Sequence, residues 1–418
     1  MKKYETYKDS GLEWLGMVPE HWEIMKVKYI CNVTDGTHFS PATISEGKPY
    51  ITVSNVKDDF IDIESAGRIS IADFNELVKQ GCQPKTGDVL LAKDGTVGRT
   101  AIVKDNDYVV LSSLGILSPN DYLTSSYLKY MLDSSILQEQ MNEAMAGSAL
   151  RRITITKIKD FIALLPPTSE QRAIASYLDH KVGQIDALIS GKEKMVEDLK
   201  AYRSSLITET VTKGLNKDVK MKDSGVEWIG KMPQNWKLLK LKRIVNLKSG
   251  TSLTSDRILD EGKYQVFGGN GPRGYIDDYT NEGNFVLIGR QGALCGNINY
   301  ANCKFWATEH AIICYPLKEI DTIWLGETLR AMNLNQYSIS AAQPGLAVER
   351  INELLIPTPS ISEQKEISSY LKLKITQIES AISEQEHQLS DLKSYKSSLI
   401  TEAVTGKIDL RDWQTKKS

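Results

Sequence analysis

The sequence predicts an α+β protein in which two mixed α/β domains are separated by two long antiparallel helices that form a coiled-coil spacer. Three observations support this fold class. A tryptophan-containing motif recurs at a constant offset, two helical segments with apolar heptad stripes recur at another, and short apolar runs fill the blocks between them. The chain of 418 residues is long enough for several folding units. We therefore expect an internal repeat with a pseudo-two-fold axis.

The first block, residues 1–165, opens with a motif at 8–22 that returns at 222–236 in the second block, residues 216–358. Both copies read Lys-Asp-Ser-Gly-x-Glu-Trp-x-Gly and continue to a Pro and a second Trp. Because large aromatic side chains are mostly buried, we expect the four tryptophans to anchor each domain to the helices. They are Trp14, Trp22, Trp228 and Trp236.

The two blocks share a mixed α/β skeleton. Short apolar runs at 89–92, 108–111 and 285–288 predict strands, and the helical periodicity of 125–145 predicts one helix. At the same offset of 214 residues as the motif, Gly36 aligns with Gly250 and Tyr50 with Tyr264, whereas the loop residues differ. Two copies of one fold with different loops indicate two related surfaces that recognise different targets.

The long helices are predicted for 166–215 and 359–405, with a short tail at 406–418. Prolines precede both helices, Ser169 and Ser362 are candidate N-caps, and Gly214 and Gly406 follow the ends. A second seam that starts at Ile174 and continues through Leu188, Met195 and Tyr202 is expected to widen the first helix's stripe. The residues expected to pack the two helices together are Leu178, Ile185, Leu199, Leu206, Leu371, Ile378, Leu392 and Leu399.

The composition excludes several classes of protein. With 41% hydrophobic residues and a formal net charge of −2, the chain is neither disordered nor collagen-like. No window approaches the roughly 18 apolar residues of a membrane span, and the N-terminus lacks the apolar stretch of a signal peptide, so we expect a cytoplasmic protein. The five cysteines include no Cys-x-x-Cys pair, which indicates reduced thiols.

Motifs for catalysis, nucleotides and metals are weak or missing. The G-x-G-x-x-G string at 269–274 is followed by residues typical of a strand or turn, so a dinucleotide site is not expected. A group of Cys295, Cys303, His310 and Cys314 fits no common zinc spacing. No phosphate-binding loop and no nuclease or amino-methyltransferase signature is present. We therefore expect no catalytic centre, metal or cofactor in this chain.

The pattern of repeats resembles the specificity subunit of type I restriction-modification enzymes over nearly the whole chain. The resemblance rests on Asp-Ser-Gly-x-Glu-Trp from Asp9 and Asp223, on Asp35-Gly36-Thr37-His38, on the Tyr264 segment, and on Glu-Gln pairs at the helix starts. It implies that the blocks are target recognition domains. It also implies that the paired helices are a spacer that docks methyltransferase subunits.

The resemblance further implies a function and a set of partners. The chain would be the non-catalytic subunit that reads an asymmetric bipartite DNA target. Its partners would be double-stranded DNA, two methyltransferase subunits and restriction or translocase subunits, with no membrane. The complex would use S-adenosylmethionine, and ATP and Mg²⁺ if a restriction subunit is present.

Candidate DNA contacts are basic or amide side chains beside glycines and turns, where a loop tip could reach a groove or a phosphate. Residues 237–290 contain nine Lys and Arg against six acids, and Gln291 occupies the place of Asp94. The alternative for each candidate is an ordinary solvated surface residue, and for the tryptophans it is direct methyltransferase contact. The candidates are Lys93, Arg99, Arg151 and Arg152 in the first block and Arg257, Arg273, Arg290 and Gln291 in the second.

Two other hypotheses remain open at this point. In one, the chain is a coiled-coil scaffold whose paired domains bind proteins rather than DNA. In the other, an enzyme is centred on the cysteine and histidine group, which metal analysis and replacement of Cys303 and His310 would test.

Overall fold

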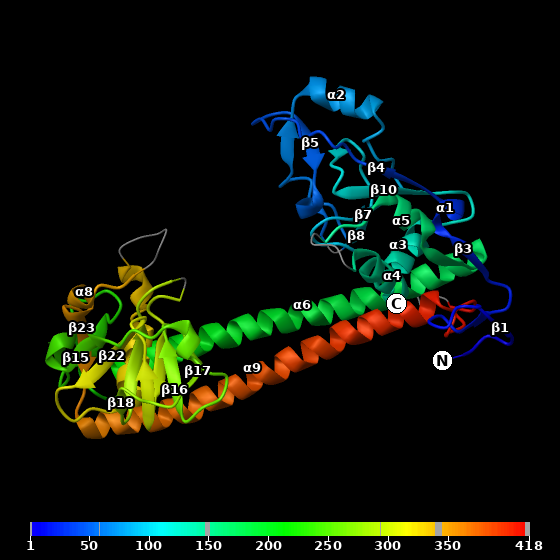
Figure 1. Cartoon of the computed structure of the whole chain (residues 1–418). Coiled ribbons are helices and arrows are strands. Elements are labelled where there is room, and N and C mark those ends of the chain that lie inside the picture. Colours follow the sequence, from blue (N-terminus) through cyan, green and yellow to red (C-terminus); the bar gives the residue numbers. More distant parts are fainter. Residues whose placement is uncertain (1, 58, 147–150, 293, 339–344, 414–418) are drawn as a thin grey trace. The chain divides into compact units, whose positions relative to one another are not determined.

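The computed structural model of the chain describes residues 2–57, 59–146, 151–292, 294–338 and 345–413 (Figure 1). The chain forms two compact units. Unit 1 contains residues 1–193 and 387–418, and unit 2 contains residues 194–386. Each unit consists of one α/β domain and a segment of each of two long helices, α6 (Thr168–Lys213) and α9 (Ile361–Val404).

The domain of unit 1 is built on an antiparallel sheet with the strand order β4-β10-β7-β8. A second sheet has the order β6-β5-β9, and the pairs β1-β2 and β3-β11 stand apart from both. The central strand β7 is the continuous apolar run that sequence reasoning predicted, and all four of its residues are buried. The strands are β1 (Tyr7–Asp9), β2 (Met17–Pro19), β3 (Glu23–Lys26), β4 (Cys31–Asp35), β5 (Lys48–Ile51), β6 (Gly67–Ile69), β7 (Val89–Ala92), β8 (Thr100–Ile102), β9 (Val109–Val110), β10 (Leu114–Pro119) and β11 (Ile162–Leu165).

The helix predicted for 125–145 is broken into two. Ser134 separates α3 from α4 with an extended backbone, φ −67° and ψ 150°, and its buried hydroxyl donates to the carbonyl of Met131. A serine that hydrogen-bonds its own backbone competes with the helical hydrogen bonds, and the periodicity of the apolar residues does not reveal this. The shorter helices of unit 1 are α1 (Val27–Ile30), η1 (Val53–Asn55), α2 (Ile71–Lys79), α3 (Ser125–Asp133), α4 (Ser135–Met145) and α5 (Ile155–Asp160).

The domain of unit 2 repeats this design. Its antiparallel sheet has the order β15-β22-β19-β20, and a second sheet has the order β17-β16-β21-β18. The G-x-G-x-x-G string lies in the β16-β17 hairpin, so the prediction that no helix follows it is confirmed. The strands are β12 (Met221–Asp223), β13 (Lys231–Pro233), β14 (Lys237–Lys240), β15 (Val245–Ser249), β16 (Tyr264–Gly268), β17 (Gly271–Ile276), β18 (Asn281–Glu282), β19 (Phe285–Gly289), β20 (Ile298–Ala301), β21 (Lys304–Ala307), β22 (Ala311–Pro316) and β23 (Leu355–Thr358). The shorter helices are η2 (Leu241–Arg243), η3 (Ser255–Arg257), α7 (Thr322–Ala331), η4 (Leu334–Tyr337) and α8 (Val348–Asn352).

Each domain is closed at its base by a two-stranded neck. In unit 1 the entering strand β3 pairs with the leaving strand β11, and in unit 2 β14 pairs with β23. Beside each neck, one carboxylate meets two lysine ammoniums at 2.5–3.3 Å. These ion pairs hold the pKa of both carboxyl groups below the usual range, that of Glu353 at about 2. The groups are Asp160 with Lys26 and Lys28 in unit 1, and Glu353 with Lys240 and Lys242 in unit 2.

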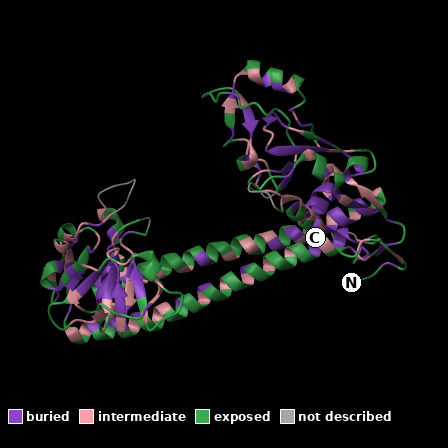
Figure 2. Cartoon of the chain, viewed as in Figure 1, coloured by how far each residue is buried: buried purple, intermediate pink, exposed green. Residues whose placement is uncertain are grey.

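The two long helices run antiparallel within each unit. In unit 1, Asp186 meets Lys396 at 2.7 Å and Glu193 meets Lys393 at 3.0 Å, so the partner's number falls as the helix advances. In unit 2, Lys200 meets Glu386 at 3.0 Å, and Arg203 and Glu379 follow the same order. Along both long helices, buried and half-buried residues alternate with exposed ones (Figure 2). The predicted packing residues are all buried or half-buried. Leu178, Ile185, Leu371, Ile378 and Leu399 are buried, and Leu199, Leu206 and Leu392 are half-buried.

The predicted second seam of the first long helix is buried at Ile174 but is wrong beyond it. Leu188, Met195 and Tyr202 are 50–56% exposed, whereas Val182 and Val196 are buried. The apolar stripe is therefore widened by Val182, four residues after Leu178, and not by Leu188, three residues after Ile185. Both spacings place a side chain beside the first seam, and only the position of the partner helix decides which side it covers.

The predicted N-caps of the two long helices are wrong, whereas the glycines predicted to follow their C-terminal ends are confirmed. Ser169 and Ser362 lie inside the first helical turns, and in α9 the hydroxyl of Ser360 accepts from the backbone of Glu363. Gly214 and Gly406 have φ of +73° and +70°, the left-handed conformation that ends helices.

Candidate nucleic-acid interface

In each domain, one end of the central sheet carries a set of loops that we call the loop cluster. In unit 1 it comprises residues 35–38, 93–99, 111–113 and 151–153, and in unit 2 residues 249–251, 290–292, 294–297, 308–310 and 345–346. In the first cluster the backbone N–H of Lys93 donates to Ser113, and that of Ile153 donates to Lys93. In the second, the backbone N–H of Arg290 donates to His310 and that of Leu346 donates to Arg290, so these two backbone hydrogen bonds recur at equivalent positions.

The aligned glycines Gly36 and Gly250 explain part of this match. A Cβ atom at Gly36 would lie 2.4 Å from the carbonyl oxygen of Leu111, and one at Gly250 would lie 2.2 Å from that of Ala307. Neither position accepts a side chain without moving the backbone, because no real Cβ comes so close. The sequence repeat therefore preserves the close approach that holds each loop cluster together.

Lys93 does not reach the surface of the first loop cluster. Its side chain is 2% exposed, and its ammonium lies 3.3 Å from the carboxylate of Asp35, which also faces His38 at 3.3 Å. Burial does not support the predicted DNA contact for Lys93, since a buried ammonium stabilises its paired carboxylate and is not available to a phosphate. Asp35 was missed as a partner, because nothing in the sequence shows that β4 lies next to this turn.

The three arginines of the first loop cluster are exposed. Arg152 lies with its Nε 3.1 Å from Oδ1 of Asp94, and the backbones of these two residues form an isolated antiparallel bridge. Arg151 is the neighbouring exposed residue. Arg99 lines a cavity of about 300 Å³ together with Asp133 and Lys396, so it faces a mixed-charge pocket.

The second group of candidates is spread over two regions of unit 2. Arg290 is half-buried and donates to the hydroxyl of Ser249 at 3.2 Å, and Gln291 is exposed at the tip of the adjoining turn. Arg257, in contrast, lies 5.8 Å from the ring of Trp306 in a cation–π contact, and Arg273 is exposed on β17. The structure thus brings only Arg290 and Gln291 into the loop cluster.

The four tryptophans of the repeated motif divide into two kinds. Trp22 and Trp236 are fully buried, and each donates its indole N–H to a glutamate at the start of a long helix, Glu170 or Glu363, at 3.0 and 2.9 Å. Trp14 is 47% exposed and Trp228 is half-buried. The glutamate of each repeated Glu-Gln pair therefore accepts the hydrogen bond of a buried tryptophan.

The glutamines of the same pairs fix each helix start to its own domain. The amide of Gln171 accepts from Thr124 and donates to Tyr122, and that of Gln364 accepts from Asp321. Both glutamines are buried, at 0% and 3% exposure. Each domain is therefore joined to the start of a long helix by buried polar contacts.

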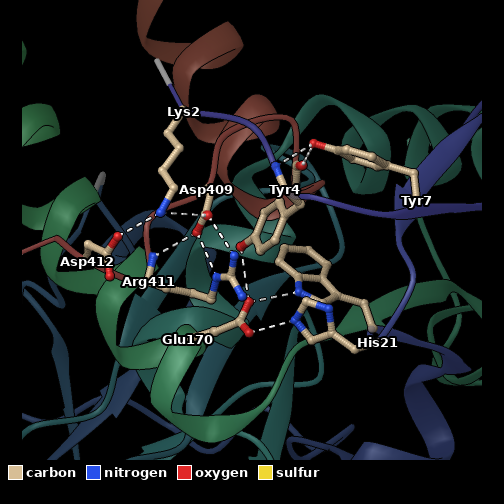
Figure 3. A network of polar contacts seen from close by, with 10 residues as sticks. Lys2, Tyr4, Tyr7, His21, Glu170, Asp409, Arg411 and Asp412 are labelled. Carbon is tan, nitrogen blue, oxygen red and sulfur yellow. Dashed lines mark hydrogen bonds and ion pairs between the residues drawn. The ribbon is translucent and has the colours of Figure 1, made fainter.

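Glu170 has further partners near the N-terminus of the chain (Figure 3). Tyr4 donates to it at 3.0 Å, and a ring nitrogen of His21 lies 2.6 Å away. Desolvation and the neighbouring Glu170 carboxylate raise the pKa of Tyr4 well above its usual range. The adjoining tail contributes Arg411, which contacts the Tyr4 ring at 5.1 Å and pairs with Asp409.

The cysteine and histidine group does not assemble. Cys295 and Cys314 are buried in apolar surroundings, whereas Cys303 is exposed. Over the described ranges, no three His, Cys, Asp or Glu side chains are placed to hold a metal ion. In the same part of the chain, no helix has the length and apolar character to cross a membrane.

Comparison with known proteins identifies the class. The family model "Type I restriction modification DNA specificity domain" matches residues 19–198 and 233–387, one match for each repeat. Since these matches cover most of the chain, this protein belongs to the type I restriction-modification specificity family. It is a specificity subunit, and such subunits are not catalytic by themselves.

Individual relatives agree with this assignment. The chain is 42% identical to the EcoprrI specificity subunit of Escherichia coli over 135 residues, which is 31% of this chain and 34% of that protein. It is 22% identical to the MjaVIII specificity subunit of Methanocaldococcus jannaschii over 446 aligned positions, which cover 98% and 97% of the two chains. A chain solved in a study of type I R-M complex assembly matches its fold with a TM-score of 0.70 at 16% identity, covering 94% of this chain and 99% of that one.

Proposed function

We propose that this chain reads an asymmetric bipartite DNA target, with one loop cluster for each half-site. The observation that supports this most directly is the match between the two loop clusters, whose backbone hydrogen bonds correspond while their side chains differ. A repeated frame with different side chains suits two readers of different base sequences, since base edges in the major groove present distinct donors and acceptors.

The long helices have two roles in this proposal. As an antiparallel coiled-coil spacer they set the separation of the half-sites, and they offer a surface to methyltransferase subunits. An α-helix rises about 1.5 Å per residue and DNA advances about 34–36 Å per turn, so helices of this length would leave unread base pairs between the half-sites. Antiparallel helices would also direct the two readers to opposite strands.

The partners and cofactors follow from the same proposal. Two methyltransferase subunits would bring S-adenosylmethionine, and restriction or translocase subunits would bring ATP and Mg²⁺. This chain would supply recognition and docking in the cytoplasm, where host DNA is found. Exposed arginines of the loop clusters would hold phosphates and thereby position the base-reading side chains.

The experiment that tests the proposal is methylation by the assembled complex. The chain is purified with the methyltransferase encoded beside it, mixed with S-adenosylmethionine and random-sequence DNA, and methylated adenines are mapped by sequencing. A split asymmetric motif with a fixed gap is expected. A single continuous palindrome would contradict two different readers. A stable complex that shows no sequence preference on DNA would favour the alternative, a scaffold that binds proteins.

A further inference from the structure

The two loop clusters differ at one pair of equivalent positions that face each other across the same backbone bridge. Asp94 is bridged to Arg152 in unit 1, and Gln291 is bridged to Gly345 in unit 2. The flanking hydrogen bonds fix the equivalence, because Ile153 donates to Lys93 and Leu346 donates to Arg290, each at 2.9 Å. A charged pair in one unit is therefore replaced by an amide and a glycine in the other.

In unit 1 the pair holds a guanidinium at the surface. Asp94 contacts Arg152 through Nε, which leaves the two terminal amino groups of the guanidinium for another partner. The Arg152 side chain is 48% exposed, so these groups are accessible, and the Asp94 side chain beneath it is 30% exposed. The contact is an ion pair, since Oδ1 of Asp94 makes no hydrogen bond within the described residues. An ion pair that restricts an arginine side chain reduces the entropy lost when that arginine binds.

In unit 2 the residue bridged to Gln291 is Gly345, so within the described residues no side chain takes the place of Arg152. Gln291 is exposed, and within the described residues its side chain makes no hydrogen bond. The next residue, Gly292, adopts φ +87° and has open space where a Cβ would lie. The amide of Gln291 therefore keeps both its donor and its acceptor for a ligand at the tip of the turn.

The two side chains suit two different bases. An arginine makes two hydrogen bonds with O6 and N7 of guanine, and a glutamine makes two with N6 and N7 of adenine. We propose that Arg152, positioned by Asp94, reads a guanine in one half-site and that Gln291 reads an adenine in the other. This assignment rests on the proposed function, and it names the residues that make the two half-sites different.

The test exchanges the two pairs and maps the methylation motif of each assembled complex. In D94Q/R152G the first cluster receives the residues of the second, and in Q291D/G345R the second receives those of the first. Each variant is expected to change one base of one half-site, with methylation of the original motif roughly 10–100-fold lower. The unaltered half-site in each variant serves as the internal control for folding and assembly.

Single replacements provide a second, independent test of the same proposal. R152A is expected to lose the guanine preference, and D94N is expected to weaken it while keeping guanine as the preferred base. Arg151 supplies a matched control, because R151A removes a neighbouring exposed charge and should lower methylation of all sites equally without changing the motif.

The outcomes distinguish a wrong assignment of Arg152 and Gln291 from a wrong proposed function. An unchanged motif in R152A and in both exchange variants, with normal assembly, overturns the assignment of these residues and leaves the two-reader function intact. A wild-type complex that methylates no split motif overturns the proposed function itself. Loss of the guanine in R152A together with loss of the adenine in Q291A supports the assignment.

Discussion

Trp22 donates its indole N–H to Glu170 across 3.0 Å, and Trp236 makes the same bond to Glu363 across 2.9 Å. Each bond joins the first motif of a repeat to the Glu-Gln pair that starts the following long helix. The two halves of the sequence repeat are therefore parts of one contact. The first copy is the more elaborate, since Tyr4 and His21 also face Glu170.

Replacement of Glu170 by alanine should destabilise unit 1 more than the equivalent change destabilises unit 2. Glu170→Ala leaves the buried donors of Trp22 and Tyr4 without a partner, at about 1–3 kcal/mol each, whereas Glu363→Ala leaves only that of Trp236. The measurement is urea unfolding followed by tryptophan fluorescence. Equal losses for the two variants would show that the additional contacts of Glu170 contribute nothing.

The two seams of the first long helix should respond differently to alanine. Leu178→Ala removes a fully buried side chain and is expected to cost about 2–5 kcal/mol of unfolding free energy. Leu188→Ala removes a side chain that is 55% exposed, and a change within about 0.5 kcal/mol is expected for the chain without partners. Thermal and urea unfolding of both variants check this. A large loss at Leu188 in the isolated chain would mean that another surface covers it.

The thiols should differ in reactivity, and Cys31 should be among the buried thiols that make stability depend on alkaline pH. Burial raises the pKa of Cys31 to about 12, and Cys303 is the exposed cysteine. A maleimide at pH 7.5 is therefore expected to label Cys303 first and the buried thiols only after unfolding.

Cys31 also supplies the pH dependence. Its folded pKa is above the unfolded value of about 9, so its contribution to stability is complete below pH 9 and is lost as the pH rises toward 12. Cys31→Ala should show a flatter decline of stability between these values than the parent chain. An identical decline in both proteins would contradict the assignment.

The ion pair between the long helices in unit 1 should be weak and sensitive to salt. A double-mutant cycle on Asp186 and Lys396, which lie 2.7 Å apart and are partly exposed, is expected to give about 0.2–1 kcal/mol. The coupling should fall when the ionic strength is raised to about 1 M, because the Debye length then shrinks to about 3 Å. Coupling that is independent of salt would indicate a desolvated pair.

The sequence predicts the architecture well because the repeated motifs mark the two domains and the two long helices. The offset of the motif aligned Gly36 with Gly250, and both glycines prove to sit where a carbonyl oxygen excludes a side chain. In the second long helix, the predicted packing residues Leu371, Ile378 and Leu399 are buried. Periodicity is reliable here because one long apolar stripe averages over many residues.

The sequence is least informative where a neighbour in space decides which way a side chain faces. Leu188 and Val182 both flank the first seam, and the sequence does not say which side the other helix covers. Lys93 lies beside glycines as a loop tip would, yet Asp35 on a neighbouring strand draws its ammonium inward. The bridge between Asp94 and Arg152 was equally hidden, because 58 residues of chain separate two atoms that lie 3.1 Å apart.

The necks at the base of the two domains have a consequence for how such proteins change. Strands β3 and β11 in unit 1, like β14 and β23 in unit 2, pair with each other, and a carboxylate shared by two lysines fastens each neck. The chain thus enters and leaves each domain at adjacent, paired strands. Exchange of the segment between the neck strands would replace both sheets of a domain together. Under the proposed function, such an exchange would change one half-site preference in a single step.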